Sequence, residues 1–104
     1  MKAGIVGAGI SGLATAHAIL ARDPRADLTV FEARERVGGK VETERTAEGY
    51  LCEWGVNAFL DKVPKTLELC AEVGLAPLRG DESAKKRYVY SEGRLHQLPE
   101  KPPA

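Results

Sequence analysis

The chain has 104 residues, with 15 lysines and arginines against 15 aspartates and glutamates, so its formal net charge is zero. This balance gives no electrostatic argument for nucleic acid or an anionic membrane as a partner. No apolar stretch approaches the roughly 20 residues of a transmembrane helix, and Met1 leads almost directly into an apolar run, which leaves no room for a secretory signal peptide. We expect a cytoplasmic domain that is too short to be a complete α/β enzyme.

The first informative stretch is a glycine-rich turn between an apolar run and a helix. Gly4-Ile5-Val6 is typical of the end of a buried strand. Gly7 can make the tight turn after it, Gly9 lets the backbone approach a pyrophosphate, and Gly12 lets the next helix pack closely on the strand. An alanine-rich helix over about Ser11 to Ala21 would direct its unpaired N–H groups and positive dipole end at the phosphates.

A second strand and an acidic residue complete a strand–helix–strand pattern. Leu28-Thr29-Val30-Phe31 is apolar, and Glu32 follows it about 20 residues after the last glycine, where a carboxylate accepts hydrogen bonds from adenosine ribose. Its charge would repel a 2′-phosphate, which disfavours NADP. The combination predicts a dinucleotide site; the alternatives are a turn without a ligand and an ordinary exposed acid at position 32.

A pair of glycines shortly after Glu32 extends the predicted site. Gly38 and Gly39 let a backbone pass close to a ligand or adopt positive φ, and Lys40 places a cation near phosphate. The alternative is an ordinary turn. We interpret Arg34-Glu35-Arg36 as a solvated face with weak exposed ion pairs.

Two hairpins and a helix are predicted in the rest of the chain. The first hairpin covers Thr43 to Glu53 around Glu48-Gly49, and the second covers Arg87 to Leu98 around Ser91-Glu92-Gly93. Between them, Val63-Pro64 opens a helix that ends at Gly74. By their i, i+3, i+4 spacing, three residues share one face of that helix: Leu67, Cys70 and Ala71.

Nothing after Ala33 offers another clear βαβ unit, so the predicted α/β sheet is incomplete. Its unpaired strand edge predicts self-association of the chain. We expect one partial domain over residues 1–98 and a proline-rich linker over residues 99–104. Cys52 and Cys70 lie in apolar contexts and are interpreted as reduced thiols, with a disulfide as the alternative; two cysteines alone cannot form a structural zinc site, and we assign no metal.

Three motifs occur in order along the chain: Gly7-x-Gly9-x-x-Gly12-x-x-x-Ala16, the acid Glu32, and Arg36-x-Gly38-Gly39-Lys40-x-x-Thr43. In this order they resemble the N-terminal FAD-binding segment of the flavin amine oxidase superfamily. The stretches Glu53 to Phe59 and Arg87 to Pro99 are most similar to its protoporphyrinogen oxidase branch. The resemblance covers essentially the whole chain. It implies a Rossmann-like FAD-binding βαβ unit with added β-hairpins, an incomplete piece of a larger two-domain flavoenzyme.

The resemblance also implies roles for individual residues. Gly7 to Gly12 would hold the FAD pyrophosphate, and Glu32 with Ala33 would meet the adenosine ribose. Val56 stands where proline is common in the family, which makes that loop less rigid because proline fixes φ. The implied cofactor-binding set is Gly7, Ala8, Gly9, Ile10, Ser11, Gly12, Glu32, Ala33, Gly39, Lys40, Gly55, Val56, Asn57 and Ala58, the last four at the flavin end.

We assign no catalytic residue within this chain. A lone histidine does not make a general base, so His96, like Tyr88 and Tyr90, is interpreted as a hairpin or surface residue. Trp54 and Phe59 are interpreted as core aromatics rather than as groups that stack on the flavin.

The implied activity is an FAD-dependent oxidation of protoporphyrinogen IX to protoporphyrin IX in haem biosynthesis. The flavin would accept hydride while the protein supplies orientation and electrostatics. The porphyrinogen-binding domain would lie outside this chain, so the isolated chain is expected to be inactive and to bind FAD weakly or not at all. Peripheral membrane contact of the whole enzyme stays open.

Three alternatives remain. The chain could belong to another member of the superfamily, such as a carotenoid desaturase or an amine oxidase, which the second hairpin pattern disfavours. A non-catalytic protein that resembles the Rab GDP-dissociation inhibitors is disfavoured by the intact glycines and Glu32. An NAD-binding domain is disfavoured by Gly38-Gly39-Lys40.

Overall fold

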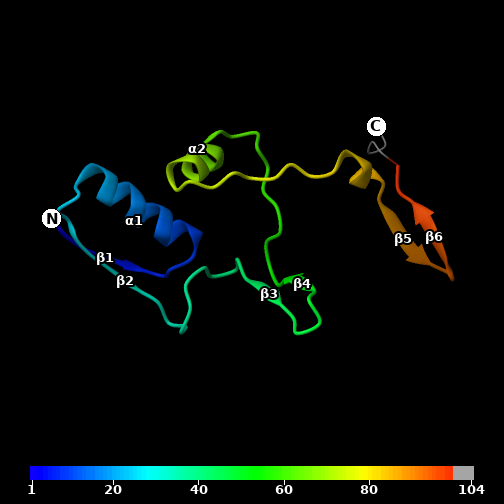
Figure 1. Ribbon diagram of the computed structural model, residues 1–104, viewed down its shortest axis with the longest axis horizontal. Helices are drawn as coiled ribbons and strands as arrows, with labels where there is room; N and C mark the ends of the chain where they lie inside the picture. The colour runs from blue at the N-terminus through cyan, green and yellow to red at the C-terminus, as the bar shows by residue number, and fades with distance from the viewer. Residues whose placement is uncertain (100–104) are drawn as a thin grey trace. The chain divides into compact units, whose positions relative to one another are not determined.

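The structure is a computed structural model that describes residues 1–99. It divides into two compact units, and the boundary between them in the sequence lies between Leu69 and Cys70. In chain order the elements are β1 (Lys2–Val6), α1 (Ile10–Arg22), β2 (Asp27–Phe31), β3 (Thr43–Arg45), β4 (Leu51–Glu53), α2 (Lys65–Glu72), a 3-10 helix η1 (Glu82–Lys85), β5 (Tyr88–Ser91) and β6 (Arg94–Gln97) (Figure 1). The predicted linker lies mostly outside the described residues.

The first unit begins with two parallel strands joined by a helix. β1 pairs with β2 in a register that runs from Lys2 opposite Asp27 to Val6 opposite Phe31. Parallel strands need a crossover, and α1 supplies it. The predicted strand–helix–strand order is therefore confirmed, with α1 one residue longer at each end than expected. The described chain has a mixed α/β fold with short sheets.

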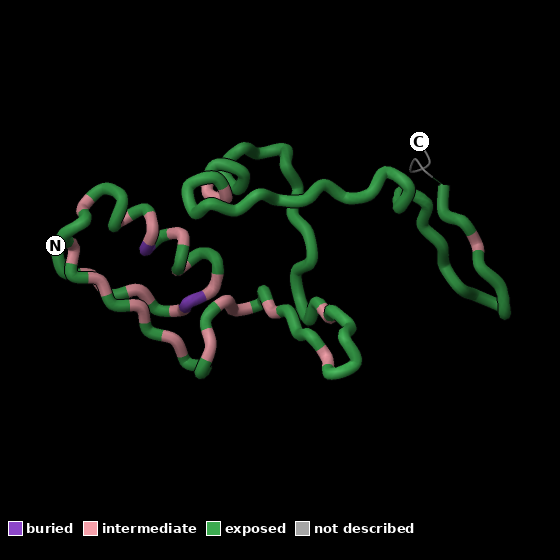
Figure 2. Tube along the Cα trace, in the orientation of Figure 1, coloured by how far each residue is buried: buried purple, intermediate pink, exposed green. Residues whose placement is uncertain are grey.

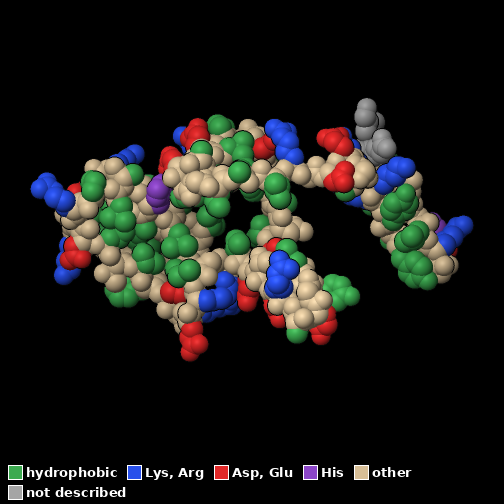
Figure 3. Space-filling model, in the orientation of Figure 1, with side chains coloured by type: hydrophobic (Ala, Val, Ile, Leu, Met, Phe, Trp, Pro, Cys, Tyr) green, Lys and Arg blue, Asp and Glu red, His purple; other side chains and the backbone are tan. Residues whose placement is uncertain are grey.

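Burial is concentrated where α1 meets the two strands. Among the described residues, the hydrophobic side chains that are buried are Ala8 and Ala16, both in this unit (Figure 2). Hydrophobic side chains also gather on the surface of the unit (Figure 3), and the Val6 side chain is 90% exposed. A two-stranded sheet with one helix covers too little area to bury these groups.

The first hairpin forms as predicted. β3 and β4 pair antiparallel, and Gly49 in the turn has a φ of 93°, which favours glycine. The interpretation of Trp54 and Phe59 as core aromatics is wrong for the described structure, because their exposed fractions are 68% and 47%. The Trp54 Nε1–H donates a 2.7 Å hydrogen bond to Glu44 Oε2 instead. Strands of three residues offer no layer that could cover an indole.

The helix α2 follows the predicted start and stop. Glu68 N–H donates to the Pro64 carbonyl at 2.9 Å, and Gly74, with a φ of 75°, ends the helix. Of the predicted apolar face, Cys70 is half-buried while Leu67 and Ala71 are exposed. Both cysteines are free thiols, as expected.

The second unit contains the predicted second hairpin. β5 and β6 pair antiparallel around Glu92 and Gly93, whose φ values are 52° and 76°. Tyr88 and Tyr90 are exposed, and His96 Nε2 lies 3.2 Å from the Ser91 carbonyl oxygen. Within residues 1–99, no helix has the length and apolar character needed to cross a bilayer.

Candidate dinucleotide-binding site

The backbone of Ala8 is the point where three segments of the first unit meet. Its N–H donates a 2.8 Å hydrogen bond to Glu32 Oε2, and its carbonyl oxygen accepts a 2.7 Å hydrogen bond from Gly38 N–H. Ala8 is 1% exposed. The first glycine loop (residues 7–9), the end of β2 and the double-glycine loop (residues 37–41) are therefore held together by the two hydrogen bonds of the Ala8 backbone.

The glycines at both ends of this turn are required by its geometry. Gly7 has a φ of 97° and donates a 2.7 Å hydrogen bond to the Phe31 carbonyl, which carries the chain from β1 into the loop. A Cβ on Gly12 would overlap the Gly7 carbonyl oxygen and lie 3.3 Å from Ile5 Cγ2. The predicted close approach of α1 to β1 is confirmed at this position.

The first glycine loop and the double-glycine loop face each other without side chains. Gly39 has a φ of 60°, and a Cβ there would lie 3.1 Å from Gly9 Cα. Gly9 is the N-cap of α1, with an extended backbone and no side-chain cap hydrogen bond. Bare backbone and uncapped helical N–H groups together fit a phosphate anion.

Glu32 presents an ionised carboxylate beside this bare backbone. Hydrogen bonds from the backbone N–H of Arg34 (3.0 Å) and of Ala8 lower the pKa of the Glu32 carboxyl below its ordinary value. One N–H reaches each carboxylate oxygen, and each oxygen accepts more than one hydrogen bond. Glu32 therefore keeps acceptor capacity for ribose hydroxyls. Ala33, which is predicted to meet the ribose together with Glu32, is exposed.

The first hairpin joins this site through a second close contact. A Cβ on Gly55 would overlap the Lys40 carbonyl oxygen, and Trp54 N–H donates a 3.0 Å hydrogen bond to the Glu42 carbonyl. Beside this contact lies an open pocket of about 530 Å³, lined by Arg34, Gly39, Lys40, Glu42, Trp54, Gly55 and Val56. The structure thus brings four residues of the predicted cofactor-binding set into one pocket lining: Gly39, Lys40, Gly55 and Val56. Asn57 and Ala58 lie outside this lining and are exposed.

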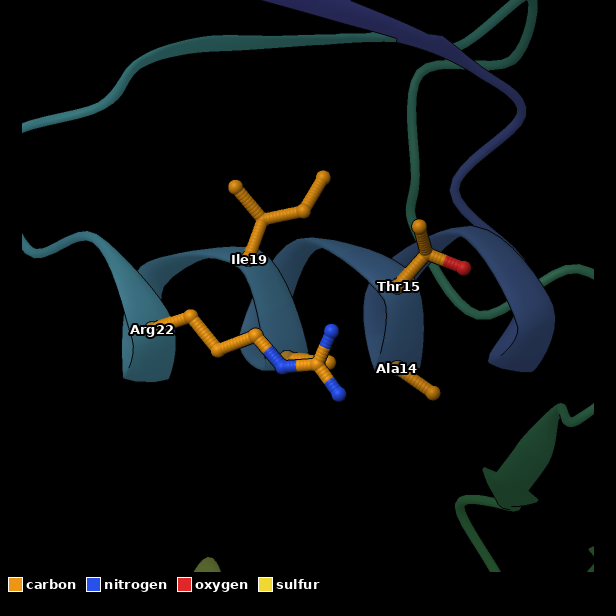
Figure 4. A pocket seen from close by; sticks show the side chains of 5 residues that line it. Ala14, Thr15, Ile19 and Arg22 are labelled. Atoms are coloured by element: carbon orange, nitrogen blue, oxygen red, sulfur yellow. The ribbon is translucent and has the colours of Figure 1, made fainter. Parts of the chain in front are cut away.

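A second pocket, of about 410 Å³, lies on the later turns of α1 and contains no predicted site residue. Its lining is Ala14, Thr15, Ala18, Ile19 and Arg22, and Figure 4 shows Ile19 and Ala14 projecting from opposite sides of the helix. Within the described part of the chain, Arg22 is the one charged side chain in this lining, and the lining contains no carboxylate, so we place the candidate site at the glycine loops.

Sequence reasoning missed the role of Arg36. The expectation of a solvated charge with weak pairs is wrong, because the guanidinium donates hydrogen bonds to three backbone carbonyls and to Glu42. The three carbonyls belong to Val37, Gly39 and Val41. The signal in the sequence was the spacing of Arg36 from the two glycines, which the resemblance motif contained.

Comparison with known proteins assigns the chain to a family. The family described as "Flavin containing amine oxidoreductase" matches residues 10–104. The chain belongs to the flavin-containing amine oxidoreductase family. The predicted resemblance is confirmed, and membership implies FAD as the cofactor. Bare glycine backbone, the ionised Glu32 and the cations of Arg34 and Lys40 in the pocket lining suit a ligand that carries a ribose and a pyrophosphate.

Individual relatives are named for porphyrinogens. The chain is 34% identical over 95 residues to "Coproporphyrinogen III oxidase" of Staphylococcus aureus, covering 91% of this chain and 20% of the relative. It is 44% identical over 101 residues to "Protoporphyrinogen oxidase, chloroplastic" of Oryza sativa, covering 94% and 18%, and 41% identical over 99 residues to the protein of that name from Nicotiana tabacum, covering 93% and 17%. The chain therefore spans about a fifth of the length of these relatives.

Proposed function

We propose that the first unit is the Rossmann-like half-site that binds the adenosine and pyrophosphate of FAD in an enzyme that oxidises a porphyrinogen. The observation that carries this proposal is the Ala8 junction, which holds Glu32 and both glycine loops at one place. Residues 1–98 would be the N-terminal part of the FAD-binding domain of this larger enzyme.

Within the proposed site each group has a separate task. Gly7 to Gly12 would form the bare backbone around the pyrophosphate, and Ile10 and Ser11 would contribute the first N–H groups of α1. Glu32 would orient the ribose, with Ala33 beside it. Lys40 would add a positive charge, and Gly55 to Ala58 would lead towards the flavin end. Bound FAD would supply the hydride-accepting chemistry.

The proposed substrate is protoporphyrinogen IX. Its conversion to protoporphyrin IX removes six electrons in three two-electron steps, and the flavin would pass them to oxygen or another acceptor. Relatives named for protoporphyrinogen support this choice at 44% and 41% identity. Coproporphyrinogen III is the second candidate, because relatives named for it match over a similar share of the chain. We propose a cytoplasmic location for the enzyme, with peripheral membrane contact as an open point.

Two measurements test the proposal. The first is a titration of the full-length apoprotein with FAD, followed by flavin fluorescence, with NAD as the control, because the isolated chain is expected to bind FAD weakly or not at all. Saturable binding of FAD but not NAD supports the half-site; saturable NAD binding contradicts it. The second supplies the full-length protein with each porphyrinogen and follows porphyrin fluorescence. Faster oxidation of protoporphyrinogen IX supports the proposed substrate, whereas preference for coproporphyrinogen III selects the second candidate.

A further inference from the structure

The Arg36 guanidinium lies at the centre of the double-glycine loop. Its Nη1 donates to the carbonyl oxygens of Val37 (3.0 Å) and Val41 (3.2 Å), and its Nη2 donates to the carbonyl of Gly39 (2.6 Å) and to Glu42 Oε2 (2.8 Å). Its side chain is 34% exposed, so the head group is partly withdrawn from water. One planar group thus holds both ends and the middle of the loop.

The loop is also shaped to receive this guanidinium. Gly38 has a φ of 111°, and a Cβ there would lie 3.1 Å from Arg36 Nη1 and 2.9 Å from the Val41 carbonyl oxygen. The same Gly38 donates its N–H to Ala8, whose own N–H reaches Glu32. A continuous series of contacts therefore runs from Arg36 through Gly38 and Ala8 to the carboxylate proposed to hold the ribose.

The geometry separates Arg36 from the neighbouring cations. The two Nη atoms carry four N–H groups and meet four acceptors, so they have no donor left for a ligand. Arg34 and Lys40 line the pocket beside Gly39, whereas Arg36 is not part of that lining.

We propose that Arg36 is a positioning residue that closes the double-glycine loop onto the first glycine loop through backbone carbonyls, without contacting the cofactor. Its effect on affinity rests on the proposed FAD binding, whereas its effect on the loop does not. Lysine cannot replace it, because an ammonium is a point charge with no planar fork to reach several carbonyls.

The loop is tested by amide hydrogen exchange in the full-length protein without added FAD. Arg36→Lys should accelerate exchange at Gly38 by about tenfold or more while amides of the β1–β2 ladder keep their protection. Glu42→Gln should have a smaller effect, since the three carbonyl contacts remain. Arg45→Ala is the control: this arginine is exposed on β3, outside the double-glycine loop, and its replacement should leave exchange at Gly38 unchanged. Unchanged exchange at Gly38 in Arg36→Lys would overturn the proposal.

The affinity is tested by FAD titration of the same variants. Arg36→Lys and Arg36→Ala should each weaken FAD binding by about tenfold to a hundredfold, and Glu42→Gln by less. Near-normal FAD affinity in Arg36→Lys, with a large loss in Arg36→Ala, would show that the positive charge acts on phosphate. A larger loss of affinity in Glu42→Gln than in Arg36→Lys would show that the Arg36–Glu42 ion pair is what matters for binding. Either result contradicts the proposal. Absence of FAD binding in the wild type would contradict the proposed function alone, because the exchange result stands without FAD.

Discussion

Gly9 and Gly12 lie in the same turn but are needed for different reasons. A Cβ on Gly12 would overlap the Gly7 carbonyl oxygen, whereas the nearest atom to a Cβ on Gly9 is Gly39 Cα at 3.9 Å, an ordinary contact. The apoprotein therefore needs glycine at position 12, and the space at position 9 is free for a ligand.

We predict that Gly12→Ala destabilises the protein, because α1 must move away from β1. The expected loss is about 1–3 kcal/mol in the free energy of unfolding, as in other overpacked sites. Denaturant unfolding of the full-length protein measures it. Gly80→Ala is the matched control, because no atom lies within 4 Å of a Cβ there. Equal stability of the two variants would contradict the prediction.

We predict that Gly9→Ala leaves unfolding nearly unchanged but weakens FAD binding by about tenfold or more, because its methyl group would occupy the approach of the pyrophosphate. FAD titration beside a thermal melt of the apoprotein separates the two effects. Wild-type affinity in this variant would argue against a pyrophosphate at the glycine loop.

The pH dependence of Glu32 follows from its hydrogen bonds. Because the N–H groups of Arg34 and Ala8 lower its folded-state pKa, Glu32 contributes stability above its unfolded-state pKa. This contribution falls away as the pH drops through the folded-state pKa. Glu32→Gln should therefore flatten the acid side of the stability curve, which unfolding at a series of pH values measures. The same acid-side loss in both proteins would show that another group is responsible.

At the scale of elements, the crossing of Gly55 over Lys40 joins the first hairpin to the double-glycine loop. The substituent on the Gly55 Cα that faces the Lys40 carbonyl oxygen can only be hydrogen, because a Cβ there would overlap that oxygen. We predict that Gly55→Ala separates the two segments and opens the pocket, changing the environment of Trp54, which lines it. A shift of Trp54 fluorescence or of its Nε1–H resonance measures this. Gly80→Ala again serves as control, and an unshifted Trp54 would contradict the crossing.

At the scale of the whole molecule, the described sheet has free edges. Among residues 1–99, β1 pairs with β2 alone, and both Val6 and Phe31 are exposed at the ends of these strands. Unpaired edges with apolar side chains favour pairing with another copy. We predict that the 104-residue chain self-associates, as measured by light scattering over a concentration series. Val6→Lys should reduce association because a charge disfavours edge pairing; a wild-type chain that stays monomeric at high concentration would contradict the prediction.

Local pattern was sufficient for the family and for the order of the strands and of α1 and α2, whereas the 3-10 helix η1 was not predicted. The turn at Gly7, the stop at Gly74 and the hairpin around Gly49 were predictable because each depends on backbone conformation within a few residues. The acid Glu32 was predictable because its distance from the glycines is set by one helix and one strand.

Other features depend on which distant groups meet, and pattern alone does not contain that information. The sequence predicts Arg36 as a solvated charge, but in the structure the carbonyls of the double-glycine loop surround its guanidinium. The sequence predicts Trp54 as a core residue, but in the described structure no layer covers β4 and the indole is exposed. Likewise, the Ala8 junction joins residues 24 positions apart. Packing decides such contacts, because the energy of a side chain depends on the atoms around it rather than on its place in the chain.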